Sequence, residues 1–336
     1  MTPTPSDRPG LFVVSLDFEL HWGIRDHSSV GSARDRLIGA RTAVPVLLDL
    51  FARRRVRATW ATVGMLMAHD RAELESMIPA VLPRYDDARL SPYPAMREVG
   101  NGEADDPFHY APSLVEQIIR TPGQEVGTHT FSHYYCLEPG QDAAAFAADL
   151  DAARRVAAGY GVEPRSIVFP RNQFNPHYLG VLARAGVRAY RTNPPTWFYA
   201  PQRVRDDRLP ARATRLLDAY APVASVIGSR AALATPGSKT GDGDRPRAVQ
   251  ASVFLRPYSS RLRALDSLRV RRIRSAMDVA AREGGVFHLW WHPHNFGRQL
   301  RENLRVLEAV LDHFEMLRRS QRMESATMLE AAWGPS

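Results

Sequence analysis

The sequence has very little cysteine: Cys136 is the only one among 336 residues. A single cysteine excludes a disulfide within the chain and any metal cluster built from several thiolates. Metal ligands in one chain must then be histidine, aspartate or glutamate. Long apolar runs are lacking too, because the run at 11–16 is interrupted by Asp17 and is too short for a signal peptide or a membrane span. We therefore expect a cytoplasmic protein without a membrane span.

The sequence also lacks a block of like charge. It has 44 basic and 36 acidic residues, a net charge of +8, and the basic residues are spread along the chain. Without a basic helix carrying interleaved aromatic residues, we expect no nucleic-acid partner. The 44% of hydrophobic residues and 24% of charged residues are typical of a globular protein. The length suits a large α/β barrel, so we expect one domain over 11–330 behind a polar tail at 1–10.

Short apolar runs alternate with stretches of helical periodicity. This alternation predicts an α/β fold with helices outside a parallel sheet that is closed, or nearly closed, as a barrel. Two excursions, at about 67–122 and 193–250, interrupt it, and the second includes a predicted mobile loop at 234–247. We expect the excursions to shape substrate access, with surface decoration as the alternative. Strands are predicted at 11–16, 57–64, 124–127, 166–169, 187–190 and 285–291, and helices at 43–51, 143–160 and 177–185.

Two acidic residues, Asp17 and Glu19, follow the first predicted strand. If the extended backbone continues, their carboxylates point to the same side of the chain. Ionised carboxylates beside an apolar strand need a cation, an arginine or water. On its own, however, the pair is more typical of a structural cap than of a metal site.

Two histidines, His129 and His133, follow the predicted strand at 124–127. On the first turn of a helix, a spacing of four residues places both imidazoles on one face. The carboxyl ends of parallel strands share one rim of a barrel, so we expect these rings near Asp17 and Glu19. Two imidazoles and one carboxylate leave a fourth position open, as in hydrolytic zinc sites. The sequence therefore predicts one divalent metal ion, zinc first, with cobalt, nickel or iron as alternatives.

Two further strand ends carry side chains that could serve the same rim. Arg171 follows the strand at 166–169, where its guanidinium could hold a carboxylate in a bidentate pair or simply be solvated. His292 follows a pair of tryptophans, and partial desolvation there could tune it for proton donation. Its alternatives are a hydrogen-bonded loop histidine and a fourth metal ligand. His288 and His294 are weaker candidates for catalysis.

The order of these motifs resembles the polysaccharide deacetylase family, also known as NodB-homology proteins or family-four carbohydrate esterases. The resemblance covers about 11–190 and 250–300. It implies an irregular (β/α)7 barrel that binds a metal and removes an acetyl group from an N-acetylated sugar. The acidic, second-strand, His-Thr-Phe-Ser-His, arginine and terminal histidine motifs lie at 15–19, 57–64, 128–133, 169–172 and 289–292.

The resemblance implies a role for each candidate residue. It makes Asp17 the general base, Arg171 the partner of Asp17 and His292 the general acid. Glu19 and the two histidines of the His-Thr-Phe-Ser-His motif would be the metal ligands. Most members have adjacent aspartates, whereas the Asp-x-Glu spacing here resembles a branch with spaced acids. The division of roles between Asp17 and Glu19 therefore stays open.

The expected partner is an N-acetylated sugar in a small molecule or a glycan precursor. Because no signal peptide is predicted, a nucleotide- or lipid-linked precursor is favoured over a finished cell-wall polymer, and the positive charge suits a phosphate-bearing one. One alternative is hydrolysis of a non-sugar amide or cyclic imide on the same barrel. Another is a metal-free carbohydrate-binding or scaffold protein. A glycosidase is disfavoured, because carboxylates two residues apart on one strand are poorly placed to flank a bond.

Overall fold

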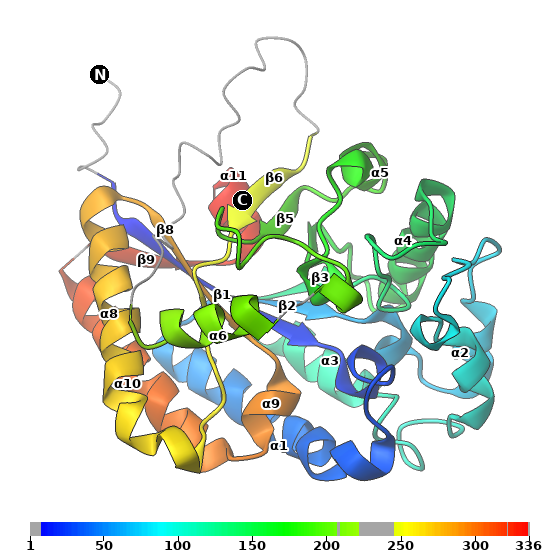
Figure 1. The fold of residues 1–336 in the computed structure, drawn as a ribbon, viewed down its shortest axis with the longest axis horizontal. Helices are drawn as coiled ribbons and strands as arrows, with labels where there is room; N and C mark the ends of the chain where they lie inside the picture. Colours follow the sequence, from blue (N-terminus) through cyan, green and yellow to red (C-terminus); the bar gives the residue numbers. More distant parts are fainter. Residues whose placement is uncertain (1–7, 207–208, 222–244, 321, 335–336) are drawn as a thin grey trace.

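A parallel sheet forms the centre of the computed structural model, which describes residues 8–206, 209–221, 245–320 and 322–334 (Figure 1). The strand order is β6-β5-β4-β3-β2-β1-β8-β7, and β9 pairs with β1 beside this path. All nine residues of β1 are buried, which accounts for its largely apolar sequence. The strands are β1 (Gly10–Phe18), β2 (Ala58–Thr62), β3 (Gln124–Thr128), β4 (Ser166–Ile167), β5 (Ala189–Thr192), β6 (Arg247–Gln250), β7 (Val253–Phe254), β8 (Val286–Trp291) and β9 (Met323–Ala326).

The two end strands of the sheet belong to one stretch of chain. β6 pairs with β5, β7 pairs with β8, and only Ala251 and Ser252 separate β6 from β7. These two residues continue the pairings, since the Ala251 N–H donates to the Thr192 carbonyl oxygen and the Ser252 N–H to that of His288. The stretch from β6 to β7 thus closes the sheet. With β6 and β7 counted as one position and β9 set aside, the predicted seven-stranded barrel is confirmed.

The helices lie outside the sheet, with α1, α8 and α10 along its lower left side in Figure 1. The helix predicted at 43–51 lies in the C-terminal half of a longer one, α1, whose start is capped by Ser29 through its side-chain oxygen. Among the described residues, no helix combines the length and the apolar character needed to cross a membrane. The helices are α1 (Val30–Arg54), α2 (Arg71–Ser76), α3 (Pro112–Arg120), α4 (Ala143–Ala158), α5 (Leu179–Arg184), α6 (Leu209–Asp218), α8 (Asp266–Glu283), α9 (Pro293–Gly297), α10 (Leu300–Arg319) and α11 (Met328–Trp333).

A close contact between α1 and α9 fixes the chain that follows β8. Gly39 of α1 faces Gly297 of α9, and a Cβ atom on Gly297 would lie 2.0 Å from the Gly39 carbonyl carbon. Only glycine permits this approach. Because α9 begins directly after His292, the contact also helps to position that histidine.

The two excursions contain regular structure of their own. The first carries α2 and ends in α3, whose Leu114, Val115 and Ile118 are buried. The second carries α6 before the chain returns as β6. Most of the loop predicted at 234–247 falls outside the described residues, since 222–244 are not among them.

Candidate metal centre

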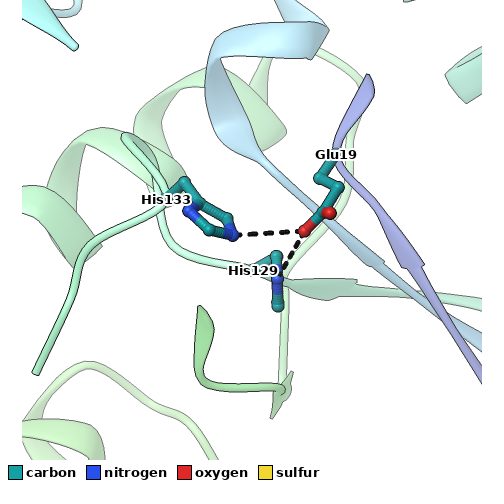
Figure 2. A group of neighbouring side chains, drawn as sticks. All are labelled: Glu19, His129 and His133. Atoms are coloured by element: carbon teal, nitrogen blue, oxygen red, sulfur yellow. Dashed lines mark hydrogen bonds and ion pairs between the residues drawn. The ribbon is translucent and has the colours of Figure 1, made fainter. Parts of the chain in front are cut away.

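Glu19, His129 and His133 converge beyond the carboxyl ends of β1 and β3 (Figure 2). The Nε2 atoms of His129 and His133 lie 3.2 and 3.1 Å from the same Glu19 oxygen, Oε2. All three side chains are buried, and one potential ligand atom from each lies within 4.8 Å of the other two. The expected meeting of the acidic and histidine motifs at one rim is therefore observed.

The predicted helical turn at the histidines is wrong, because this segment is a loop. His129 follows β3 directly, and Thr130 and His133 have φ angles of 64° and 58°. These left-handed residues bend the chain so that both rings face Glu19, with ring centroids 5.2 Å apart. Leu20, directly after Glu19, has a φ of 44°. Strained backbone of this kind clusters at functional sites.

Hydrogen bonds hold the histidine loop in place. His129 Nδ1–H donates to the Val168 carbonyl oxygen at 2.7 Å, which leaves Nε2 as the acceptor nitrogen that faces Glu19. Asp149 of α4 accepts hydrogen bonds from the Phe131 N–H at 2.7 Å, from the Ser132 N–H at 3.2 Å and from the Ser132 hydroxyl. The loop that carries both imidazoles is thus fastened to its neighbours on each side.

The electrostatics of the three residues suit a divalent cation. Burial alone would raise the pKa of Glu19, but His292, His129 and His133 outweigh it and hold this pKa well below the ordinary value. Burial lowers the pKa of His133 to about 4, so its ring is neutral at pH 7. An ionised carboxylate and neutral imidazoles are the forms in which these groups bind metals.

Glu19 owes its position to a glycine. A Cβ atom on Gly23 would lie 2.0 Å from the Glu19 Cδ atom, so any larger residue would displace the carboxylate. Gly23 ends a short 3-10 helix that begins directly after Glu19 and whose residues are all buried. This helix folds the chain back over the carboxylate at the strand end.

Asp17 is held by Arg191, and the predicted pairing with Arg171 is wrong. The two terminal nitrogens of Arg191 donate to the two carboxylate oxygens of Asp17, each at 2.7 Å. The same guanidinium donates to Ser15 Oγ at 3.0 Å and to Asn172 Oδ1 at 2.8 Å. Burial alone would raise the pKa of Asp17, but Arg191 above all lowers it below the ordinary value. Asp17 is therefore ionised at neutral pH.

Arg171 contacts a different carboxylate at the same rim. Its Nη2 lies 2.8 Å from both oxygens of Asp26, and its guanidinium lies 5.9 Å from the Tyr135 ring centroid. Arg171 and Asn172 have φ angles of 52° and 53°. This turn presents Asn172 to Arg191 and sends Arg171 to Asp26, which explains why the predicted partner differs.

His292 lies beside both acidic residues. Its Nε2 is 3.6 Å from Asp17 Oδ2 and 3.7 Å from Glu19 Oε1. Its side chain is 21% exposed, against 3% and 5% for the two acids, so it is the member of this group most open to a substrate. Of the two tryptophans that precede it, Trp290 flanks His292 with ring centroids 5.7 Å apart, whereas Trp291 packs against Phe51 and Phe296.

The two other histidines of this region are more deeply buried. His288 Nε2 lies 2.8 Å from Ser15 Oγ inside the barrel, and burial lowers its pKa to about 3. His294 Nδ1 lies 3.8 Å from Glu19 Oε1, and burial lowers the pKa of His294 to about 3 as well. Both rings are neutral at pH 7, so neither is a ready proton donor.

Sequence reasoning missed Arg191. The strand predicted at 187–190 stops one residue short of it, whereas β5 runs from Ala189 to Thr192. A charged residue inside a strand of a barrel buried on both faces was the available signal, since such a charge requires a partner.

The sequence of residues 35–190 matches the polysaccharide deacetylase family. This segment contains His129, His133 and Arg171, while Asp17, Glu19 and His292 lie outside it. No curated protein is significantly similar to the chain in sequence.

Several solved structures share the fold over nearly the whole chain. A Mycobacterium smegmatis protein with a provisional assignment as a polysaccharide deacetylase has a TM-score of 0.56 and 16% identity, covering 96% of this chain and 90% of its own. A probable polysaccharide deacetylase from Pseudomonas aeruginosa PAO1 has a TM-score of 0.54 and 12% identity, with coverages of 98% and 93%. The Puue allantoinase has a TM-score of 0.55 and 12% identity, with coverages of 99% and 93%. At such identities these likenesses concern the fold, and the matched segment 35–190 confirms the resemblance to the polysaccharide deacetylase family that the motifs predict.

Proposed function

We propose that the protein is a metal-dependent hydrolase that removes the acetyl group from the nitrogen of an N-acetylated sugar or glycoside precursor. The proposal rests on one observation, that three features lie next to one another. A Glu-His-His donor set lies beside an ionised carboxylate, Asp17, and a partly exposed imidazole, His292. Metal-dependent hydrolysis of an unactivated amide requires a metal site, a general base and a general acid, and these residues could supply all three.

The donor set fits a divalent cation, and zinc is the first choice. Two imidazoles and a carboxylate are common zinc ligands, and three protein ligands leave a position for a substrate or water. A cation held by Glu19, His129 and His133 supplies Lewis acidity toward an acyl oxygen and an attacking water.

In this proposal Asp17 is the general base and His292 the general acid. Arg191 keeps Asp17 ionised and fixes both of its oxygens, so the carboxylate can take a proton from water attacking the acetyl carbon. His292, the more exposed group, delivers a proton to the nitrogen as the C–N bond breaks. The products are acetate and a free amine. Proton delivery matters because an amide nitrogen leaves poorly as an anion.

Arg171 has a supporting role in this proposal. It pairs with Asp26 and lies against Tyr135, whose ring contacts His133 with centroids 5.1 Å apart. Arg171 thus acts through its neighbours on the histidine loop. Asp17 depends on Arg191 instead.

A second candidate is hydrolysis of a non-sugar amide or cyclic imide. It is favoured by one observation, that an allantoinase has the same fold at a TM-score close to that of the deacetylase-like neighbours. Both candidates need the same metal ligands, base and acid, so substrate choice alone separates them.

The test is acetate release by the full chain after chelation and reloading with zinc, cobalt, nickel or iron. Acetate release from acetamido sugars, free and nucleotide-linked, would be compared with ring opening of cyclic amides, which release no acetate. We expect metal-dependent acetate release that falls about 10²- to 10⁴-fold in His292→Ala, while the bound metal is retained. Hydrolysis of cyclic amides alone would favour the second candidate. Under about 0.1 equivalents of metal after titration would overturn both and favour a metal-free binding protein.

A further inference from the structure

A cavity lies next to the candidate catalytic residues. Its volume is about 330 Å³, at the lower end of the roughly 300–1,000 Å³ of small-molecule sites. Trp290 forms part of its wall and connects it with the catalytic residues. The Trp290 ring centroid lies 4.1 Å from the Arg191 guanidinium carbon and 5.7 Å from the His292 ring centroid. A substrate that reaches Asp17 and His292 therefore has room to continue into this cavity.

The cavity is strongly basic. Among the described residues, its lining contains four arginines and a single acidic residue, Asp218. Asp218 is already engaged, since the Tyr199 hydroxyl donates to it at 3.0 Å and Arg272 lies 3.6 Å away. The four arginines are Arg171, Arg203, Arg215 and Arg256.

Arg256 and Arg203 are the arginines with capacity for a ligand. In the part of the chain that the structure describes, neither forms an ion pair with a carboxylate. Arg203 uses only its Nε, which donates to the Leu137 carbonyl oxygen at 3.2 Å. Burial, together with the positive charges of Arg215 and Arg269, lowers the pKa of Arg256. A half-buried guanidinium among other guanidinium groups is stabilised by an anion.

The wall of the cavity nearest the catalytic residues is aromatic. The rings of Phe254 and Trp290 lie 4.6 Å apart at an interplanar angle of 48°, and both also contact the His292 ring. Flat apolar surfaces of this kind bind the apolar face of a sugar ring. From the catalytic residues outward, the order is therefore an aromatic surface and then arginines.

We propose that this cavity binds a phosphate group attached to the N-acetylated sugar, with Arg256 and Arg203 as its ligands and Trp290 and Phe254 beneath the sugar. Guanidinium groups bind phosphate in bidentate fashion, and a phosphate has enough oxygens for two arginines at once. The inference rests on the proposed function, because it extends the substrate of the same site. A nucleoside diphosphate and a lipid diphosphate both present this chemistry.

The kinetic test compares an N-acetylhexosamine with its 1-phosphate, its nucleoside diphosphate and a short polyprenyl diphosphate derivative. We expect kcat/KM of the zinc-loaded chain to be about ten- to hundredfold higher for phosphorylated sugars, the usual value of one or two charge-assisted hydrogen bonds. Arg256→Ala and Arg203→Ala should remove this preference by lowering kcat/KM for the phosphorylated sugars. Between the two diphosphates, the higher kcat/KM identifies the source of the phosphate.

Two control variants address location and folding. Arg261 lines a separate basic hollow beside His294, and Arg319 is 82% exposed on α10. Arg261→Ala and Arg319→Ala should keep the preference for phosphorylated sugars. If Arg261→Ala abolishes it, the phosphate site lies in the other hollow and the proposal is overturned. If Arg256→Ala lowers the melting temperature, the test relies on Arg203→Ala, because Arg203 is the more exposed arginine. An unchanged preference for phosphorylated sugars in Arg203→Ala would then overturn the proposal.

A binding measurement separates this inference from the proposed function. Calorimetric titration of the metal-free full chain with N-acetylhexosamine 1-phosphate should show binding that weakens at least tenfold in Arg256→Ala and weakens with added salt. Such binding, together with no acetate release by the zinc-loaded chain, would uphold the phosphate site and refute the deacetylase. Acetate release by the zinc-loaded chain with equal kcat/KM for neutral and phosphorylated sugars would uphold the deacetylase and refute the phosphate site.

Discussion

The two ends of the barrel bury a carboxylate in opposite ways. At the carboxyl ends of the strands, Asp17 receives two hydrogen bonds from Arg191, and its pKa lies below the ordinary value. At the amino end, Glu125 receives hydrogen bonds from the hydroxyls of Thr59, at 2.6 Å, and Ser166, and burial raises its pKa. A guanidinium keeps a buried carboxylate charged, whereas hydroxyl donors do not offset its desolvation. Only the first end keeps a base ready for chemistry.

The two ends also differ in access. Helix α11 covers the amino end: Met328 is fully buried, and its N–H donates to Thr59 Oγ1 at 2.8 Å. A capping box between Thr327 and Glu330 fixes the start of this helix. At the other end, His292 remains 21% exposed beside the arginine-lined cavity. Barrel enzymes generally place their chemistry at the carboxyl ends of the strands, and here the amino end is physically closed.

Neutralising the two carboxylates should give the largest contrast between the ends. Asp17→Asn removes the proposed base, so kcat should fall about 10²- to 10⁴-fold with little loss of bound metal. Glu125→Gln mimics a protonated carboxyl and should leave kcat within about twofold. The measurement is acetate release by both variants, together with zinc content and circular dichroism. Equal activity of Asp17→Asn and the unaltered protein would contradict the assignment of the base.

Adding a methyl group at Gly23, at the carboxyl ends of the strands, should have the next largest effect. In Gly23→Ala the new Cβ atom would collide with the Glu19 carboxylate, so zinc affinity should fall by about 10- to 100-fold, as for other changes that misplace a metal ligand. Competition with a chromogenic chelator measures this affinity. Gly31→Ala is the matched control, because its Cβ atom would meet only Ser29 Oγ, at 4.0 Å. Unchanged zinc affinity in Gly23→Ala would show that Glu19 is not a ligand.

Much of this barrel could be predicted from the sequence. Strands buried on both faces have apolar runs that can be recognised in the sequence. Because the carboxyl ends of parallel strands share a rim, the local pattern alone predicted that Glu19 lies close to His129 and His133. The closure of the sheet was harder to foresee. It depends on a short stretch, 247–254, that pairs with two different strands in succession. No local periodicity distinguishes such a stretch from a loop.

The site departs from prediction where backbone geometry is unusual. The histidine spacing suggested a helix, but left-handed Thr130 and His133 achieve the same convergence in a loop. Likewise, the turn at Arg171 and Asn172 reverses which side chain faces inward, and Arg191 supplies the guanidinium from the next strand. Left-handed conformations at non-glycine residues have no reliable sequence signal, because tertiary contacts impose them.

A third buried carboxylate, Asp149, extends the comparison between the two ends of the barrel. Its substitution should have the smallest of the three effects. It lies near the open end and anchors the histidine loop, yet it resembles Glu125: burial raises its pKa to about 7 although Ser132 and the Phe131 N–H donate to it. An unfolded aspartate ionises near pH 3.9. Between that pH and about 7, the unfolded chain therefore binds fewer protons than the folded one. The contribution of Asp149 to the free energy of unfolding should therefore fall as pH rises through this window, by at most about 1.4 kcal/mol per pH unit, and level off above it, whereas the buried neutral histidines contribute with the opposite sign.

The difference in free energy of unfolding between the unaltered chain and Asp149→Asn should show this slope, because the amide does not titrate and the other groups contribute equally to both proteins. Urea unfolding of the chelator-treated chain, measured at intervals from pH 4 to pH 8, isolates the contribution from that of metal binding. Asp151→Asn on the same helix is the matched control, since the Asp151 side chain is 62% exposed and its pairing with Arg155 is screened by water. An equal pH dependence of Asp149→Asn and the unaltered chain would mean that the pKa of Asp149 is not raised, and that a raised pKa does not distinguish the structural carboxylates from the proposed base.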